Sequence, residues 1–193
     1  MKRVDFFFDL SSPYSYMCAT QIDALCARHG AEAVWRPFVL GAVFKTVGNV
    51  MPAACAPKAI WMVRDLERWA AQYGVQFRMT TRFPVNAMGA MRLVLVAEAA
   101  QPGRGGRALA QAAFHALWVE DRDLTAPEVL DELARAVGLD GAAGIEAPAI
   151  KAALRENTDE AVRRGAFGAP AVFYGDQLFW GNDRLHFLEA ALR

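Results

Sequence analysis

The hydrophobic pattern of this chain changes its period twice, and this restricts the folds open to it. Residues 4–40 read as strand, helix and strand, the middle reads as helices alone, and the end returns to short strand-like runs before a last helix. Apolar runs of about four to eight residues are typical of buried strands, whereas recurrence at three and four residues is typical of helices. The pattern therefore predicts an α/β protein with a helical insertion in the middle of the chain.

The first forty or so residues carry the clearest signals. Residues 4–9 form an apolar, aromatic run and are predicted to be a strand buried on both faces, in the middle of a mixed sheet. Ser12 followed by Pro13 is a typical helix start, a hydroxyl N-cap before proline, for a helix that reaches about residue 28. A second strand is predicted over 33–40, where Pro37 indicates an edge position or a bulge.

The rest of the chain divides into a loop, a helical region and a hairpin. Residues 41–57 contain Gly41, Gly48, Asn49 and Pro52 and are predicted to be a loop. Alanine-rich helices are expected over residues 58–73, 86–100, 106–119, 126–137 and 148–164. A hairpin is predicted over 171–180, followed by a helix over 183–192. We expect one domain made of residues 1–40 and 165–193, with residues 41–164 as an all-helical insertion.

Composition excludes several classes of partner. The 193 residues carry 21 Lys and Arg against 21 Asp and Glu, so no basic field indicates a nucleic-acid partner. Three sparse cysteines predict neither a disulfide scaffold nor a metal site. The sequence shows no secretory signal and no apolar window free of charges, so no membrane partner is expected and a cytoplasmic location is predicted.

The predicted first helix begins where the thioredoxin superfamily, which shares this order of elements, places its chemistry. Redox members need Cys-x-x-Cys there, but this chain has Ser12-Pro13-Tyr14-Ser15, so dithiol redox chemistry is excluded. A serine hydroxyl at a helix start is able to donate a hydrogen bond to a sulfur anion brought by a ligand. The alternative is that Ser12 is only an N-cap.

Short motifs spread over almost the whole chain point to one family. The longest is Phe8-Asp9-Leu10-Ser11-Ser12-Pro13-Tyr14-Ser15-Tyr16. The others follow in order: Arg36-Pro37, Gly48-Asn49, Pro57-Lys58, Asp65-Leu66, Phe83-Pro84-Val85-Asn86, Gly168-Ala169-Pro170 and Phe179-Trp180-Gly181-Asn182-Asp183-Arg184-Leu185. Together they resemble the kappa-class glutathione transferases and their bacterial relatives, the 2-hydroxychromene-2-carboxylate isomerases. The resemblance implies a thioredoxin-like domain (βαβ…ββα) with the helical insertion.

The resemblance also implies a role for individual residues. Ser12 would face the sulfur of glutathione, with Ser11 as the alternative. Ala169-Pro170 would contain a cis-proline, and the Ala169 backbone would pair with the cysteinyl part of glutathione. The remaining implied glutathione contacts are Asn182 and Asp183 at the γ-glutamyl end, with Asp183 facing the ammonium, and Asn49 and Lys58 at the backbone and the glycyl carboxylate. From the sequence alone, Asn182 or Asp183 is also expected to cap the last helix, and Lys58 reads as a solvated lysine.

The function implied is that of a glutathione-dependent isomerase. It would convert 2-hydroxychromene-2-carboxylate, a small aromatic carboxylate, to trans-o-hydroxybenzylidenepyruvate, with glutathione as cofactor and a homodimer as the assembly. The alternatives are a kappa-type transferase and a non-catalytic binding module. Lys58 or Arg36 would hold the substrate carboxylate. Tyr14, Trp35 and Phe44 are candidates for the pocket wall; Cys18 is expected to be buried and inert, and Asp65 to lie on an exposed helix face.

Overall fold

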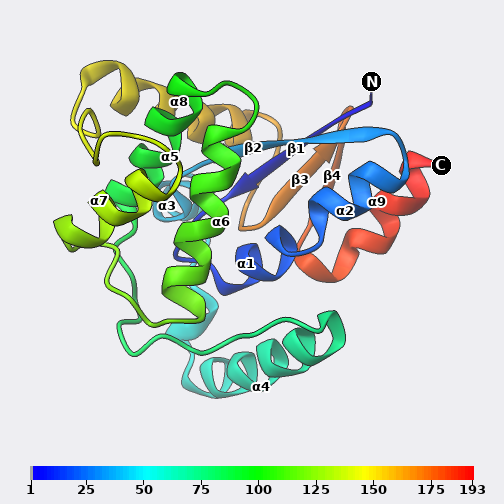
Figure 1. The fold of residues 1–193 in the computed structure, drawn as a ribbon. Helices are drawn as coiled ribbons and strands as arrows, with labels where there is room; N and C mark the ends of the chain where they lie inside the picture. Colours follow the sequence, from blue (N-terminus) through cyan, green and yellow to red (C-terminus); the bar gives the residue numbers. More distant parts are fainter. Residues whose placement is uncertain (1) are drawn as a thin grey trace.

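A mixed sheet of four strands forms the centre of the protein, in a computed structural model that describes residues 2–193. The strands are β1 (Lys2–Phe8), β2 (Ala31–Pro37), β3 (Ala171–Tyr174) and β4 (Gln177–Trp180), in the spatial order β2-β1-β3-β4 (Figure 1). β1 runs parallel to β2 and antiparallel to β3. The predicted central position of β1 and edge position of β2 are therefore confirmed, and so is the thioredoxin-like fold class.

Helices surround the sheet, and most of them lie between β2 and β3 in the sequence. The α-helices are α1 (Pro13–Ala19), α2 (Ile22–Arg28), α3 (Leu40–Val47), α4 (Ala56–Tyr73), α5 (Met88–Ala100), α6 (Gly105–Trp118), α7 (Pro127–Ala136), α8 (Pro148–Arg163) and α9 (Leu185–Leu192). Two short 3₁₀ helices, η1 (Pro52–Ala54) and η2 (Asn182–Arg184), complete the set within the described residues. None of the helices in residues 2–193 has both the length and the hydropathy to cross a membrane.

Two predictions about the helices were wrong. The single helix expected from residue 13 to 28 is broken between α1 and α2, where the Gln21 N–H bonds to the Cys18 carbonyl three residues back. The Thr20 hydroxyl donates to the Met17 carbonyl at the same point (2.8 Å), which competes with regular helix bonding. Residues 41–57 are also not a plain loop, because they contain most of α3 and all of η1. Burial of Val43 outweighs the low helix propensity of Gly41.

β1 is buried on both faces along Phe6, Phe7 and Phe8, as its apolar, aromatic run predicted. Val4, Phe6 and Phe8 belong to the large core that includes α1, α2, α5, α6 and α9. Phe7 points to the opposite face, where its ring makes edge contacts with Phe38 and with other members of a smaller core under α3 and α8. Burying such a ring contributes roughly 2–3 kcal/mol of hydrophobic free energy, so this strand fixes both layers of helices.

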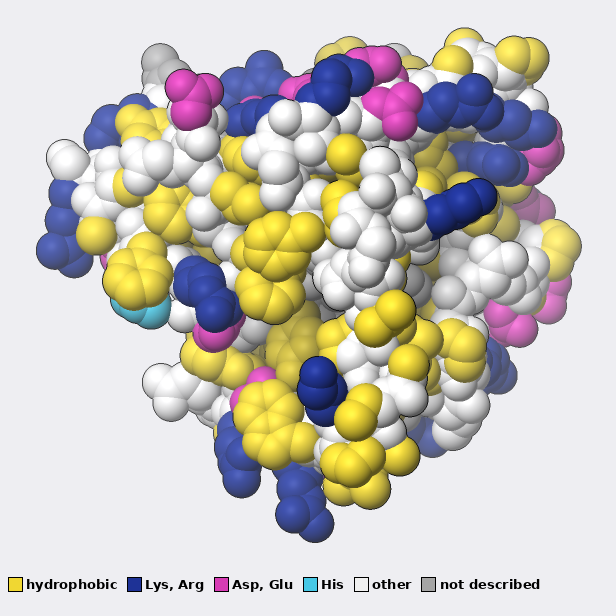
Figure 2. Space-filling model, turned by 180° about the vertical axis from the view of Figure 1, so that it is seen from behind, with side chains coloured by type: hydrophobic (Ala, Val, Ile, Leu, Met, Phe, Trp, Pro, Cys, Tyr) yellow, Lys and Arg dark blue, Asp and Glu magenta, His cyan; other side chains and the backbone are white. Residues whose placement is uncertain are grey.

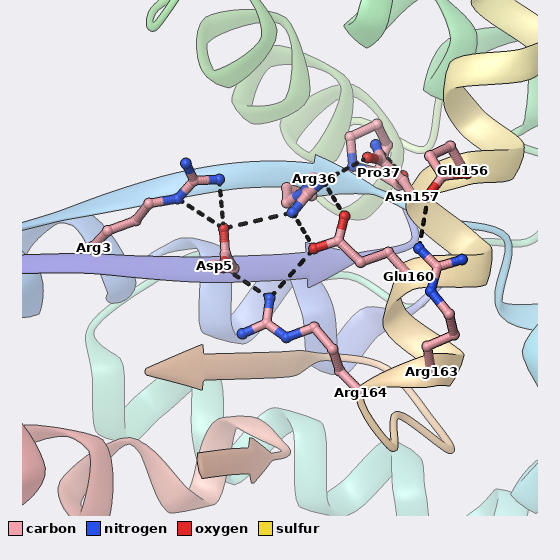
Figure 3. A network of polar contacts seen from close by, with 9 residues as sticks. All are labelled: Arg3, Asp5, Arg36, Pro37, Glu156, Asn157, Glu160, Arg163 and Arg164. Carbon is pink, nitrogen blue, oxygen red and sulfur yellow. Dashed lines mark hydrogen bonds and ion pairs between the residues drawn. The ribbon is translucent and has the colours of Figure 1, made fainter. Parts of the chain in front are cut away.

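A network of charged side chains ties β1 and β2 to α8 (Figure 3). Arg36 on β2 donates to both carboxylate oxygens of Glu160 (2.7 and 2.6 Å). Arg164 donates to Asp5 on β1 (2.8 Å) and lies 3.5 Å from Glu160. Arg36 is thus committed to this network, which removes one of the two cations suggested for a substrate carboxylate.

Because of this network, the free energy of unfolding is expected to depend on pH in the acid range. Burial raises the pKa of Asp5, but hydrogen bonds and charges from Arg164 and Arg3 outweigh it, so the pKa lies below its ordinary value. A lowered pKa in the folded state stabilises the protein above the unfolded-state pKa, and this contribution is lost as pH falls through the folded value. We expect Arg164→Gln to cost about 1 kcal/mol at neutral pH and clearly less at about pH 3. Urea unfolding at both pH values tests this, and an equal loss at both would contradict it.

Candidate active site

Ser12 lies where the first helix meets the distant segment that precedes β3. It is the N-cap of α1, with extended backbone (φ −95°, ψ 114°), and its Oγ accepts a hydrogen bond from the Ser15 N–H (3.2 Å). The same hydroxyl donates to the Ala169 carbonyl at 3.5 Å. The N-cap expected from the sequence is therefore confirmed, and the side chain, 5% exposed, faces Ala169 as well.

Ser11 has a different set of contacts. Its backbone N–H and its Oγ both donate to the Asp9 carboxylate, at 2.8 and 2.7 Å. This hydroxyl is committed to a neighbour on its own turn. Of the two adjacent serines, the structure brings Ser12 to the Ala169 segment.

The Ala169-Pro170 peptide bond is cis, as the resemblance implied. The Pro170 carbonyl accepts a hydrogen bond from the Gly181 N–H (3.1 Å), whereas the Ala169 N–H donates to no group in residues 2–193. Gly168 is needed just before it, because a Cβ there would lie 2.6 Å from Nε1 of the Trp180 indole. Ala169 thus presents an unpaired N–H and a weakly bonded carbonyl beside Ser12, the pair of groups that an extended peptide uses.

Asn49 joins the segment after α3 to the same region. Its Nδ2 donates to the Phe167 carbonyl (2.9 Å), and its Oδ1 accepts from the Val50 N–H (2.8 Å). Lys58, in the first turn of α4, is exposed and pairs with no carboxylate in the described part of the chain. The structure brings Asn49 to the Ala169 segment by a direct contact, while it connects Lys58 to the site only through its place on α4.

Asn182 and Asp183 lie in η2, directly after the strand that ends at Trp180. Asn182 is buried; its Nδ2 donates to the Tyr73 hydroxyl (3.3 Å), which in turn donates to the Asn182 carbonyl (3.0 Å). Asp183 is exposed and pairs with Arg184 at 2.5 Å. The expectation that either residue caps the last helix was wrong, because the chain forms a 3₁₀ turn there and Arg184 occupies the N-cap of α9.

Tyr14 joins α1 to α4 through a hydrogen bond to a carboxylate. Its hydroxyl donates to the Asp65 carboxylate (3.0 Å). Asp65 is half-buried, so the prediction that it lies on an exposed helix face was wrong. Burial, and then the negative charges of Asp65 and Asp183, raise the pKa of Tyr14 far above its ordinary value. The phenol therefore stays protonated and acts as a donor.

Other predicted pocket residues take different positions. Trp35 is in the core, with its ring against Phe6 and Phe8, so its assignment to the pocket wall was wrong. Phe44 is half-buried on α3. Cys18 is fully buried, and desolvation raises the pKa of its thiol, as expected for an inert cysteine. The described residues contain no group of three side chains able to hold a metal ion.

Exposed apolar side chains lie on the same segments as Asn49, Lys58 and Ala169. We call these side chains the apolar rim: Val47, Val50, Met51, Ile60, Trp61 and Phe167, which are 38% to 72% exposed. Figure 2 shows hydrophobic side chains gathered about a hollow in the lower part of the face it draws, at the height of α4. Such a surface suits an aromatic ring better than a strongly hydrated ligand.

Comparison with known proteins relates this arrangement to enzymes. The family model described as DSBA-like thioredoxin domain matches residues 3–193. A 2-hydroxychromene-2-carboxylate isomerase of Sphingobium xenophagum is 36% identical over 99% of this chain and 98% of its own. Glutathione S-transferase kappa 1 of Caenorhabditis elegans is 30% identical over 100% of this chain and 92% of its own.

A solved structure agrees with these relatives. The structure of a selenomethionine 2-hydroxychromene-2-carboxylate isomerase superposes with a TM-score of 0.89, at 27% identity, over 98% of this chain and 94% of that one. The fold and the relatives lead to the same group. The chain belongs to the DSBA-like thioredoxin domain family, and proteins similar to it over almost its whole length are named as isomerases and kappa-class glutathione transferases.

Proposed function

We propose that this protein is a glutathione-dependent isomerase that converts 2-hydroxychromene-2-carboxylate to trans-o-hydroxybenzylidenepyruvate. The observation that carries the proposal is the meeting of the Ser12 hydroxyl with the backbone of Ala169, 3.5 Å away, in a site without a thiol of its own. The isomerase relative that aligns over 98% of its length supports the choice of reaction.

The groups around Ser12 suit glutathione. The unpaired N–H and the carbonyl of Ala169 are complementary to the cysteinyl residue of an extended tripeptide. In this proposal Asn49 contacts the backbone of glutathione, Lys58 its glycyl carboxylate, and Asn182 and Asp183 its γ-glutamyl end. Bound glutathione would supply a thiolate that adds to the conjugated double bond of the ring-opened hemiketal. The resulting single bond rotates, and elimination of the thiolate restores the double bond in the trans product and regenerates glutathione.

When glutathione binds, the Ser12 hydroxyl would turn its one proton from the Ala169 carbonyl to the sulfur anion and stabilise that anion by a hydrogen bond. The start of α1 adds the partial positive charge of a helix end, which lowers the thiol pKa from its free value of about 8.5. The apolar rim would hold the aromatic ring. The protonated Tyr14 hydroxyl keeps Asp65 in place beside α1.

The main alternative is a kappa-type transferase, which the 30% identity to such an enzyme favours. The two reactions differ in what happens to glutathione. An isomerase turns over the chromene acid with catalytic amounts of glutathione, whereas a transferase consumes one glutathione for each molecule of an electrophile such as a chloronitrobenzene. Measuring free thiol during both assays separates them. If calorimetry detects no glutathione binding, a non-catalytic module is the remaining reading.

Lys58 offers a test of how glutathione lies in the site. Lys58→Ala is expected to weaken glutathione binding about fivefold, since an exposed ion pair contributes up to roughly 1 kcal/mol. Glutathione esterified at its glycyl carboxylate should bind the wild type equally weakly and should lose nothing further with Lys58→Ala. Calorimetry with both ligands and both proteins measures this cycle. Independent losses for the ester and the variant would show that Lys58 contacts another group.

A further inference from the structure

Asp9 is a buried carboxylate just after β1, beside the turn that contains Ser11 and Ser12. It is 4% exposed, and it accepts three hydrogen bonds: from the N–H and Oγ of Ser11 and from the N–H of Leu40 (2.9 Å). The groups that stabilise its charge are neutral, and burial raises its pKa. Burying a carboxylate with only neutral partners is costly, so the three hydrogen bonds must be well placed to hold it there.

The bond to Leu40 gives Asp9 a second function, as a cap for α3. The N-cap residue of that helix is Val39, which has no side-chain acceptor. The Asp9 carboxylate supplies the acceptor from outside the helix and places a negative charge at its N-terminus, where the helix dipole favours one. Asp9 thereby joins the Ser11–Ser12 turn to the first turn of α3.

The other end of α3 leads to the Ala169 segment. Gly48 ends the helix in the left-handed conformation (φ 71°), and the Asn49 N–H bonds back to the Phe44 carbonyl (3.0 Å). The Asn49 side chain then holds Phe167, two residues before Ala169, whose carbonyl accepts from Ser12. Asp9, α3, Asn49, residues 167–169 and Ser12 thus form a closed ring of contacts, which we call the Asp9 ring.

We propose that Asp9 is a positioning residue, which sets the separation of the Ser12 hydroxyl and the Ala169 backbone by holding α3, and with it Asn49, in place. This inference rests on the proposed function, because these two groups are the ones assigned to glutathione. Asp9 touches neither the sulfur nor the substrate in this account. Its removal acts through the ring, and small displacements in a site of this kind lower binding and rate strongly.

Two variants disturb the hydrogen bonds of Asp9 in different ways. Asp9→Asn keeps the size of the side chain but places an amide N–H where Leu40 or Ser11 needs an acceptor. Leu40→Pro removes the Leu40 N–H and, with it, part of the side chain that packs against the smaller core, so Leu40→Ala serves as its control. Proline is tolerated at the first helical position, and Val39 already has the extended backbone preferred before proline (φ −91°, ψ 100°). Each of the two variants is expected to weaken glutathione binding about tenfold and to raise the pKa of the bound thiol.

A double-mutant cycle tests the route through α3. Asn49→Ala breaks the ring at its other end, so the part of its effect on the glutathione dissociation constant that acts through the ring should be absent in Asp9→Asn. Only the loss of its own contact with glutathione should remain. Lys58→Ala is the matched control, because within residues 2–193 the Lys58 side chain makes no hydrogen bond or ion pair with the ring; its effect should multiply with that of Asp9→Asn. If Asn49→Ala, like Lys58→Ala, weakens glutathione binding by the same factor in Asp9→Asn as in the wild type, Asp9 does not act through α3 and Asn49.

Amide hydrogen exchange of the ligand-free protein gives a readout that does not need glutathione. The N–H groups of Asn49 and Gly181, bonded to Phe44 and Pro170, should exchange faster in both variants, while amides in α6 keep their wild-type rates. Folded variants with wild-type exchange, affinity and thiol pKa would overturn the inference alone. If the wild type binds no glutathione, the proposed function fails, and the exchange rates still decide whether Asp9 positions this segment.

Discussion

Replacement of Ser12 by alanine is expected to lower turnover of the chromene acid about 100-fold, the usual loss when one hydrogen-bond donor to a developing anion is removed. The variant should still bind glutathione, because the Ala169 backbone and Asn49 are unchanged. It also loses an N-cap, which costs about 1 kcal/mol of folding free energy. Initial rates with saturating glutathione, measured well below the melting temperature, separate the two effects.

Ser11→Ala is the matched control for this experiment. The two serines are neighbours, but the Ser11 hydroxyl is bonded to Asp9 and not directed to Ala169. We expect Ser11→Ala to reduce turnover only a few-fold. Similar losses for both variants would mean that the hydroxyl of Ser12 has no special role, and unchanged turnover in Ser12→Ala would remove that role entirely.

Gly105→Ala is expected to be the most destabilising of the glycine-to-alanine substitutions in the helical region. Gly105 begins α6 against the end of α5, and a Cβ there would overlap the backbone carbonyl of Ala97. Because a backbone group cannot move aside as a side chain does, we expect a loss of about 3 kcal/mol. In a chain of this length that corresponds to a fall in melting temperature of about 10 °C.

Gly41→Ala gives the opposite result in the same assay. Gly41 lies in α3, and a Cβ there would meet nothing within 4 Å. Alanine is the better helix former by roughly 1 kcal/mol, so this variant should be as stable as the wild type or slightly more so. Thermal unfolding of both variants compares them directly. A Gly105→Ala protein that melts with the wild type would show that α5 and α6 separate more easily than their packing indicates.

Local signals in the sequence were sufficient for the sheet. The run of three phenylalanines predicted a strand buried on both faces, and Phe7 does pack opposite to Phe6 and Phe8. Ser12 and Pro13 predicted the start of α1, and Pro37 the edge position of β2. Each of these features depends on neighbours in the sequence, so each was readable from it.

Long-range contacts were not readable in the same way. The break between α1 and α2 was missed for a local reason, because the Thr20 hydroxyl donates to the Met17 carbonyl three residues back. α3, in contrast, depends on burial of Val43 in the smaller core. Asp9 read as the polar end of a strand, although it caps a helix that begins far along the chain at Leu40. The period at which hydrophobic residues recur indicates which face of a helix or strand is buried, but not which other element packs against that face.

The candidate site also has residues that the sequence predicted and residues that only the structure showed. Ser12 and Ala169-Pro170 were predicted from motifs, and the structure brings them together. Tyr73, which bonds Asn182 from α4, was missed because its signal is only one more tyrosine on a helix. That Arg36 is not free to hold a substrate carboxylate was also visible only in the structure, in which it donates to Glu160.

Titration of glutathione bound to the wild-type protein tests the central claim most directly. The ultraviolet absorbance of the thiolate, followed against pH, gives the pKa of the bound thiol. Hydrogen bonding to Ser12 at the start of α1 predicts a value at least one unit or so below the free value of about 8.5, with a return toward that value in Ser12→Ala. A bound thiol that titrates like free glutathione, in a wild-type protein saturated with it, would contradict the account.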